Sequence, residues 1–296
     1  MTPGADSPTI AVVGAGSWGT ALAVQLGRGG RPVTLWGRNA NELQSVAASR
    51  INQRYLPGVT LPPSVRIEPG LGGVVRSHRE ILLCVPSHAF RATLAAIRPD
   101  LQPHTRVSWA TKGLEHSTGR LPHEVAAEVL GANVPMAVLS GPTFAREVGA
   151  GLPTAMTVAS NDASFATALA ARLSDKTFRA YTSDDMIGVE VGGAVKNVLA
   201  IGAGISDGLG FGANTRIALI TRGLVEMTRL GTALGAKPAT FMGLSGMGDL
   251  VLTCTDDQSR NRRFGLAIAR GESAADAARH IGQVVEGQFA AGAVRA

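Results

Sequence analysis

The chain has 296 residues, which is enough for one large domain or two domains of ordinary size. Hydrophobic residues make up 45% of it and charged residues 17%, as is typical of a globular protein with a buried core. The net charge of +6 is spread along the chain and aromatic residues are few, which argues against a nucleic-acid partner and suits small anionic substrates such as phosphates.

The first predicted strand, residues 9–13, runs directly into the sequence G-A-G-S-W-G at 14–19, and a helical stretch follows. A G-x-G-x-x-G pattern between a strand and a helix is typical of dinucleotide binding. Gly14 would make the tight turn, Gly16 would let a pyrophosphate approach the backbone, and Gly19 would pack the helix on the strand. The N-terminus of that helix would attract the phosphates. The alternative is an ordinary tight turn.

Residues 32–36 predict the second strand. Enzymes that use NAD usually place an acidic residue near the end of this strand, where it binds the ribose hydroxyls. This chain has Gly-Arg-Asn at 37–39 instead, and the guanidinium of Arg38 is suited to a two-pronged pair with a 2′-phosphate. We therefore expect NADP(H) to be preferred over NAD(H). The alternative for Arg38 is a solvated surface arginine.

Further apolar runs alternate with helical stretches up to about residue 185, which predicts an α/β domain at 1–185 with a Rossmann-type, doubly wound sheet. Residues 52–58 (N-Q-R-Y-L-P-G) are expected to form a loop. The runs predicted as the remaining strands are 65–67, 80–85, 106–110, 136–139, 154–158 and 178–182.

Two segments are predicted to lie at the carboxyl ends of these strands, where such sheets bind ligands. Lys112 follows the strand at 106–110 and is expected to bind an anion. Residues 140–145 (S-G-P-T-F-A) join a strand to a helix, and their small hydroxyl side chains suit a ligand rich in oxygen. Both segments would face the same crevice.

After residue 182 no convincing strand is found, so residues 186–296 are predicted to form an all-α second domain. The helical stretch 191–205 is apolar apart from Lys196 and Asn197. A lone ammonium in such a helix is costly unless it is paired or takes part in chemistry, and desolvation lowers the pKa of a lysine toward the range useful for proton transfer. Two interpretations remain open: a catalytic lysine, or a lysine that extends along the helix to solvent.

Two later loops carry further candidate groups. In residues 244–250 (L-S-G-M-G-D-L) the glycines predict a sharp loop, and Asp249 opens the next apolar run. Ser259 is predicted to cap a helix, which would place Arg260 and Asn261 at its N-terminus. Arginine and amide donors at a helix N-terminus suit a phosphate, and the alternative is a solvated basic turn.

The remaining features concern compartment and partners. Cys84 and Cys254 both lie in apolar runs and resemble neither a disulfide framework nor a metal site, so a reducing cytoplasm is expected and a metal is not. The N-terminus has no signal pattern, and no uncharged apolar run has the length of a membrane span, so stable membrane insertion is not expected. The oligomeric state is open, with a homodimer among the expectations.

Taken together, five segments resemble the bacterial NAD(P)-dependent glycerol-3-phosphate dehydrogenases. They are G-A-G-S-W-G-T-A-L-A at 14–23, T-K-G-L-E at 111–115, S-G-P-T-F-A at 140–145, G-G-A-V-K-N at 192–197 and L-S-G-M-G-D-L-V-L-T-C at 244–254. The runs S-R-N-R-R-F-G at 259–265 and V-V-E-G at 284–287 add to the resemblance, which spans residues 9–287. Related dehydrogenases share the glycine loop but not the later motifs, so the combination is specific.

This resemblance implies a role for individual residues, with Lys196 as the general acid/base. The implied substrate-binding residues are Lys112, Gly141, Thr143, Lys196, Asn197, Asp249, Ser259, Arg260 and Asn261. The implied cofactor is NADPH, with NAD as an alternative. Its implied contacts are Gly14, Gly16, Ser17, Trp18, Gly19, Arg38, Lys112, Ala145, Arg260, Val284 and Glu286.

The implied reaction is the reversible reduction of dihydroxyacetone phosphate to sn-glycerol 3-phosphate, which supplies phospholipid synthesis. Asp249 would hold the ammonium of Lys196 in position, and no metal would be required. One rival is a related 3-hydroxyacid, imine or ketopantoate reductase, which would not predict the phosphate-site candidates Lys112 and Arg260-Asn261. Another is a catalytically silent NADPH-binding protein, which would need no proton donor.

The chain departs from the family pattern at two places. Thr143 stands where the family usually has serine; threonine keeps the hydroxyl, so the role is expected to survive. The sequence ends at Ala296, whereas family members normally carry a further helical stretch of a few dozen residues. The second domain is therefore expected to be shortened at its C-terminus.

Overall fold

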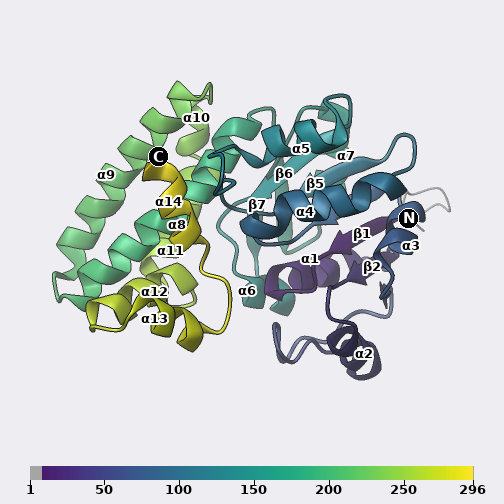
Figure 1. The fold of residues 1–296 in the computed structure, drawn as a ribbon, viewed down its shortest axis with the longest axis horizontal. Helices are drawn as coiled ribbons and strands as arrows, with labels where there is room; N and C mark the ends of the chain where they lie inside the picture. The colour runs from purple at the N-terminus through teal and green to yellow at the C-terminus, as the bar shows by residue number, and fades with distance from the viewer. Residues whose placement is uncertain (1–8, 296) are drawn as a thin grey trace.

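A computed structural model describes residues 9–295, which form an eight-stranded sheet flanked by helices and then a helical region beside it (Figure 1). The strands lie in the order β3-β2-β1-β4-β5-β6-β7-β8, and all neighbours are parallel except the antiparallel pair β6 and β7. Their bounds are β1 Ile10–Val13, β2 Val33–Trp36, β3 Val65–Ile67, β4 Glu80–Leu83, β5 Arg106–Trp109, β6 Met136–Ser140, β7 Thr154–Ser160 and β8 Phe178–Ser183. The prediction of a doubly wound α/β sheet is confirmed, although the antiparallel pair was not predicted.

Helices cover both faces of the sheet and make up the later part of the described chain. Those of the sheet region are α1 Ser17–Gly27, α2 Ala40–Ser49, α3 Leu71–Arg76, α4 Ser87–Ile97, α5 Pro122–Leu130, α6 Ala145–Ala150 and α7 Ala163–Leu173, with a 3-10 turn at Arg98–Asp100. The later helices are α8 Met186–Gly208, α9 Gly212–Ala233, α10 Pro238–Phe241, α11 Asp249–Thr255, α12 Arg260–Ala269, α13 Ala274–Ile281 and α14 Glu286–Arg295, with a π-helical turn, η2, at Leu244–Gly248. The predicted helical character after the sheet is confirmed.

The central strand β1 shows why the sheet is buried on both faces. Side chains alternate along a strand, and all four residues of β1 are apolar. Ile10 and Val12 pack into a core with α1 and α7, whereas Ala11 and Val13 pack into a second core with α4 and α5. A parallel sheet covered on both faces needs such continuous apolar runs, and they made these strands predictable.

Helix α8 is the centre of the helical region. By length and composition it is apolar enough to cross a membrane, which differs from the expectation drawn from 191–205 alone, because the helix extends to 23 residues. However, 67% of its most apolar stretch is buried inside the protein. In Figure 1 it lies among α9, α11, α12 and α14. It is therefore the core helix of this region.

Glycines bring α8 close to its neighbours. A Cβ at Gly193 would lie 3.2 Å from Ser140 Oγ and 3.4 Å from Lys112 Cγ, both in the sheet region. A Cβ at Gly192 would overlap the carbonyl of Ser245 in η2, and one at Gly204 would overlap the carbonyl of Arg262 in α12. Gly193 therefore brings α8 against the sheet region, whereas Gly192 packs within the helical region.

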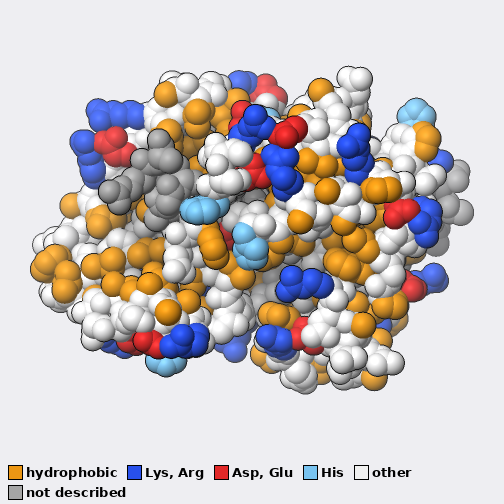
Figure 2. Space-filling view, viewed as in Figure 1, with side chains coloured by type: hydrophobic (Ala, Val, Ile, Leu, Met, Phe, Trp, Pro, Cys, Tyr) orange, Lys and Arg blue, Asp and Glu red, His pale blue; other side chains and the backbone are white. Residues whose placement is uncertain are grey.

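Charged side chains are interspersed over the face shown in Figure 2 and do not gather into one basic field. On α9, Arg222, Glu226 and Arg229 are all exposed, and Glu226 pairs with both arginines. Mixed charges of this kind provide solubility and give little support for a nucleic-acid surface.

Candidate active site

The glycine loop between β1 and α1 has the form expected for a dinucleotide site. Gly14 has a φ of +122°, and a Cβ there would overlap the carbonyl of Cys84, while a Cβ at Gly19 would overlap the carbonyl of Gly14. These two glycines are thus required by the fold itself. A Cβ at Gly16, in contrast, would meet no atom within 4 Å, and no side chain caps the helix that begins after it. Gly16 therefore leaves open backbone, with free N–H groups, for an anionic ligand.

The loop lies where the sheet order reverses between β1 and β4, the position at which such sheets bind ligands. Other candidates contact one another at the same edge. Lys112 follows β5, and its Nζ lies 3.2 Å from the carbonyl of Gly141, which follows β6. Thr143 Oγ1 donates to the same carbonyl at 3.2 Å. The structure therefore brings together the two segments predicted to face one crevice.

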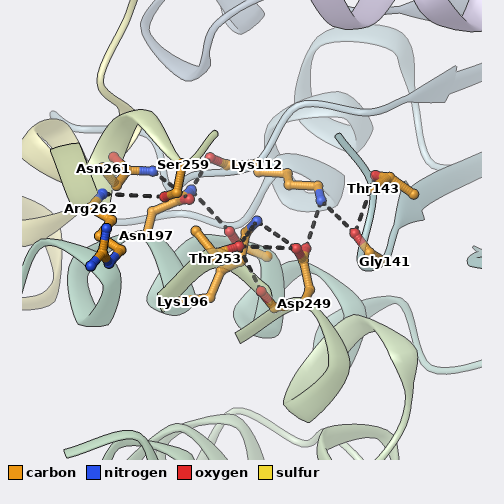
Figure 3. A network of polar contacts seen from close by, with 11 residues as sticks. Lys112, Gly141, Thr143, Lys196, Asn197, Asp249, Thr253, Ser259, Asn261 and Arg262 are labelled. Carbon is orange, nitrogen blue, oxygen red and sulfur yellow. Dashed lines mark hydrogen bonds and ion pairs between the residues drawn. The ribbon is translucent and has the colours of Figure 1, made fainter. Parts of the chain in front are cut away.

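A cluster of one carboxylate and two ammonium groups joins this edge to the helical region (Figure 3). Asp249 accepts from Lys196 Nζ through Oδ1 and from Lys112 Nζ through Oδ2, each at 2.6 Å. Lys196 Nζ also donates to Thr253 Oγ1 at 2.9 Å, and Thr253 in turn donates to the carbonyl of Asp249. Lys196 is only 7% exposed, so it does not extend to solvent.

The proton affinity of this cluster suits acid–base chemistry. Burial lowers the pKa of Lys196 to about 8, although the nearby carboxylate of Asp249 opposes the shift. Burial alone would raise the pKa of Asp249, but the charges of Lys112 and Lys196 outweigh it and hold that pKa below its usual range. Asp249 is thus ionised and Lys196 holds a proton that it can release near neutral pH.

Asn197 is the other polar residue of the apolar stretch 191–205, and both polar atoms of its carboxamide are hydrogen-bonded. Its Nδ2 donates to the carbonyl of Gly193 at 3.1 Å and to that of Lys112 at 3.4 Å, and its Oδ1 accepts from Asn261 Nδ2 at 2.8 Å. Asn261 Oδ1 also accepts from the backbone N–H of Gly287 at 2.9 Å. Asn261 therefore ties α8, α12 and α14 together, and its amide is engaged within the protein.

The start of α12 agrees with the sequence prediction. Ser259 caps the helix, accepting from the N–H of Arg262 at 3.2 Å, so Arg260 and Asn261 occupy the first turn. Arg260 Nη1 donates to Gln283 Oε1 at 3.4 Å, and Ser17 Oγ of the glycine loop donates to the same oxygen at 3.3 Å. This arginine therefore lies beside the candidate coenzyme loop as well as at a helix N-terminus.

The last cofactor candidates also approach the sheet region. Glu286 accepts from the backbone N–H of Ser87 at 3.1 Å and from its Oγ at 2.6 Å, so it caps α4. Arg38, at the carboxyl end of β2, is exposed. The other two candidates have apolar side chains: Ala145 begins α6 and packs on the core of the sheet, and Val284 lies in the 282–285 linker.

Trp18, in the glycine loop, contributes a second observation about what this loop could bind. Its Nε1 is buried with no hydrogen-bond partner among the described residues. Such a donor is costly unless a ligand or water meets it. The glycine loop therefore fits a polar ligand on two separate grounds, the open Gly16 and the unpaired indole.

Sequence reasoning missed several residues of the site. Thr253, Gln283 and Ser87 make contacts between segments far apart in the chain, and nothing local marks them. His123, on α5, is half-buried, with Nδ1 2.5 Å from a carboxylate oxygen of Glu190. The apolar neighbourhood of Glu190 on α8 was the one available signal for that pair.

Comparison with known proteins places this site in a family. The models for the N-terminus and the C-terminus of NAD-dependent glycerol-3-phosphate dehydrogenase match residues 9–166 and 185–296. The chain belongs to the glycerol-3-phosphate dehydrogenase family. It is 60% identical over 279 residues to a glycerol-3-phosphate dehydrogenase [NAD(P)+] of Pseudoalteromonas translucida, covering 94% of this chain and 83% of the relative. A relative of the same name from Edwardsiella ictaluri is 58% identical over 280 residues, with the same two shares of 94% and 83%.

Solved structures agree with the assignment. The chain matches a glycerol-3-phosphate dehydrogenase of Coxiella burnetii with a TM-score of 0.95 and 49% identity, over 98% of this chain and 88% of that one. A ketopantoate reductase of Ralstonia eutropha matches with a TM-score of 0.58 at 18% identity, over 97% of this chain and 96% of that one, which shows a shared fold alone. The enzyme is thus an NAD(P)-dependent oxidoreductase, and the reductase rival is not favoured.

Proposed function

We propose that the enzyme reduces dihydroxyacetone phosphate to sn-glycerol 3-phosphate, reversibly, with NADPH as the preferred coenzyme. The observation that carries the proposal is the Lys196–Asp249–Lys112 cluster, in a chain of this family. Lys112 follows β5 and the glycine loop follows β1, so both lie at the carboxyl ends of strands of the same sheet. Two ammonium groups share one carboxylate there, so the cluster carries a net positive charge. Such a charge favours an anionic substrate and stabilises a developing oxyanion.

Lys196 is the proposed general acid/base. With a pKa of about 8, its amine is protonated by about ten to one at pH 7. When bound, NADPH supplies the hydride that makes the ketone carbon an alcohol carbon. Lys196 Nζ gives its proton to the substrate oxygen as negative charge develops there, and takes it back in the reverse direction. Asp249 and Thr253 keep the nitrogen in place before and after the transfer.

The phosphate end of the substrate is proposed to bind at the start of α12. Free N–H groups of the first turn and the guanidinium of Arg260 provide donors there, and Ser259 fixes where the helix begins. Asn197 and Asn261 act mainly by holding α8 and α12 at a fixed separation, since their amides already bond to one another. Lys112, Gly141 and Thr143 complete the proposed substrate side.

The coenzyme is proposed to lie along the glycine loop. Gly14, Gly16 and Gly19 shape the loop, and Ser17 and Trp18 open α1. Arg38 is placed to hold a 2′-phosphate, because it follows β2 and is exposed. Ala145, Val284 and Glu286 are the remaining proposed contacts, with Lys112 and Arg260 between coenzyme and substrate.

Three further proposals concern the domains, the compartment and the use of the product. Residues 1–185 form the coenzyme domain and 186–296 the substrate domain, because α8 begins at Met186 directly after the last strand. The enzyme works in the cytoplasm, in keeping with its two free cysteines. Its product supplies glycerophospholipid synthesis.

NADPH oxidation tests the proposal when dihydroxyacetone phosphate is set beside unphosphorylated dihydroxyacetone. We expect kcat/KM to be larger for the phosphorylated substrate by at least about a thousandfold, because charge-assisted bonds to phosphate are lost with the other. Equal rates with both substrates would remove the phosphate site. No reaction with either, while ketopantoate is reduced, would favour the reductase rival.

A further inference from the structure

The segment between α2 and β3 is firmly anchored although it contains little regular structure. Arg50 begins it in a left-handed conformation, with a φ of +57°, and its guanidinium donates to the carbonyl of Pro62 at 2.5 Å and that of Val65 at 2.8 Å. Ile51 and Thr60 form a bridge, and Leu56 is 3% exposed in the core beneath α1. A segment held in this way can act as a rigid support.

Asn52 extends from this segment to the back of the glycine loop. Its side chain is 3% exposed, and its Nδ2 donates to the carbonyl of Ala15 at 2.9 Å and to Thr20 Oγ1 at 2.8 Å. Its Oδ1 accepts from the N–H of Tyr55 at 3.3 Å. One buried carboxamide thus connects the glycine loop, the first turn of α1 and its own segment.

The bond to Ala15 has a consequence for the next residue. A peptide unit is planar and trans, so the carbonyl of Ala15 and the N–H of Gly16 point in opposite directions. Asn52 holds the carbonyl from the protein side, and the N–H of Gly16 is therefore directed away from Asn52. Gly16 is also the loop glycine beside which an added Cβ would meet no atom within 4 Å.

We propose that Asn52 is a positioning residue for coenzyme binding, fixing the Ala15–Gly16 peptide so that the loop N–H groups point at the diphosphate. This inference rests on the proposed coenzyme site. Asn52 does not touch the ligand; it acts through the backbone of the loop and through Thr20. The segment 52–58 thereby becomes part of the dinucleotide site, although it lies outside the glycine fingerprint.

The chain offers a matched control at the other end of the same helix. Gln25 is also 3% exposed, and its Nε2 donates to the carbonyl of Leu173 at 3.0 Å and to Asp175 Oδ2 at 2.8 Å. It therefore resembles Asn52 in burial and in the number of donated bonds, but it lies away from the loop. Any effect of losing a buried carboxamide on α1 stability alone should appear in both variants.

Dissociation constants measured by titration test the proposal, with NADPH set beside adenosine 2′-monophosphate, which has no diphosphate. For Asn52→Ala we expect NADPH to bind roughly ten- to a hundredfold more weakly, as for the loss of charge-assisted hydrogen bonds, and 2′-AMP to bind within about twofold of wild type. Gln25→Ala should leave both constants unchanged. If Asn52→Ala fails to fold, Asn52→Asp keeps the shape and Oδ1 but lacks the N–H donors, and the same split is expected.

Several results would overturn the inference. NADPH affinity within about twofold of wild type in the folded Asn52 variant would show that the loop does not need this support. Equal weakening for NADPH and 2′-AMP, or equal weakening in Gln25→Ala, would reduce Asn52 to a stability residue. The variant Gly16→Ala distinguishes failure of the Asn52 inference from failure of the proposed coenzyme site. Its added methyl group has space in the protein but would meet a bound diphosphate. Normal NADPH binding by Gly16→Ala would overturn the proposed coenzyme site itself.

Discussion

Replacing Asp249 by asparagine perturbs the centre of the proposed site with little change of shape. Asp249 is 1% exposed and accepts 2.6 Å bonds from both Lys112 and Lys196. The substitution removes the negative charge, so the partly buried ammonium group of Lys112 and the buried one of Lys196 lose the carboxylate that compensates them. Removing one partner of a buried ion pair typically costs about 3–5 kcal/mol.

If the cost arises from the buried ammonium of Lys196, the loss of stability should depend on pH. Without Asp249, the pKa of Lys196 falls below its wild-type value of about 8, because the carboxylate opposes the effect of burial. A lysine whose pKa is lower in the folded state than in the unfolded state gains stability as the pH rises from the folded-state pKa toward the unfolded-state pKa of about 10.4. In Asp249→Asn this gain begins at a lower pH than in wild type, where it begins near pH 8. The deficit of Asp249→Asn relative to wild type is therefore largest near pH 6.5 and shrinks as the pH rises through 8.

Thermal unfolding at pH 6.5 and pH 9.5 measures this difference. At pH 6.5 we expect the Tm of Asp249→Asn to fall by about 6 °C or more, taking about 2 °C per kcal/mol. Asp207→Asn is the matched control, since Asp207 pairs with Arg216 at 2.8 Å and Arg262 at 2.6 Å, and arginines do not titrate in this range. Its deficit should be the same at both pH values. An Asp249→Asn deficit that is equally constant, or absent, would refute the charge-sharing account.

Three further outcomes are expected from the same geometry. Arg38→Ala should raise the KM for NADPH by about tenfold or more and leave that for NADH within about twofold, since only NADPH has the 2′-phosphate; steady-state kinetics with both coenzymes decide it, and equal losses would remove the contact. The kcat/KM for reduction should fall as pH rises above about 8 and that for oxidation should rise through the same range, because the first needs protonated Lys196 and the second needs the free amine. A profile flat from pH 6 to 10 would exclude Lys196 as the titrating group. Arg260→Ala should lower kcat/KM for dihydroxyacetone phosphate by at least about a hundredfold and change that for dihydroxyacetone little, whereas equal effects on both would place the phosphate elsewhere.

Features that depend on local sequence were predictable. Apolar runs identified the eight strands to within two residues at each end, because a sheet buried on both faces needs them. Ser259 was recognisable as a helix cap because capping is a property of the residue and its immediate neighbours. The glycine loop was recognisable because its three glycines serve three separate purposes: the tight turn, the approach of a diphosphate and the packing of the helix on the strand.

Features that depend on packing between distant segments were not predictable. Asp249 was expected to hold Lys196, but its second bond to Lys112 arises only when the two regions meet. Glu286 was assigned to the coenzyme, but its bond to Ser87, 199 residues away in the chain, was not predicted. No periodicity or spacing in the sequence predicts such contacts.

The antiparallel pairing of β6 and β7 belongs to the same class. Both strands are apolar, and an apolar run has the same sequence pattern whichever way it is paired. The connection between them, residues 141–153 with α6, is long enough for either direction, so it does not indicate the pairing either.

The most direct test of the account is the turnover of Lys196→Ala with saturating NADPH and dihydroxyacetone phosphate at pH 7. Asp249 keeps its bond to Lys112 in this variant, so the fold should persist. We predict that kcat falls by about a hundred- to ten-thousandfold, as for the loss of a general acid, while the dissociation constant of NADPH stays within about twofold of wild type. Turnover within tenfold of wild type would contradict the assignment of Lys196 as the proton donor.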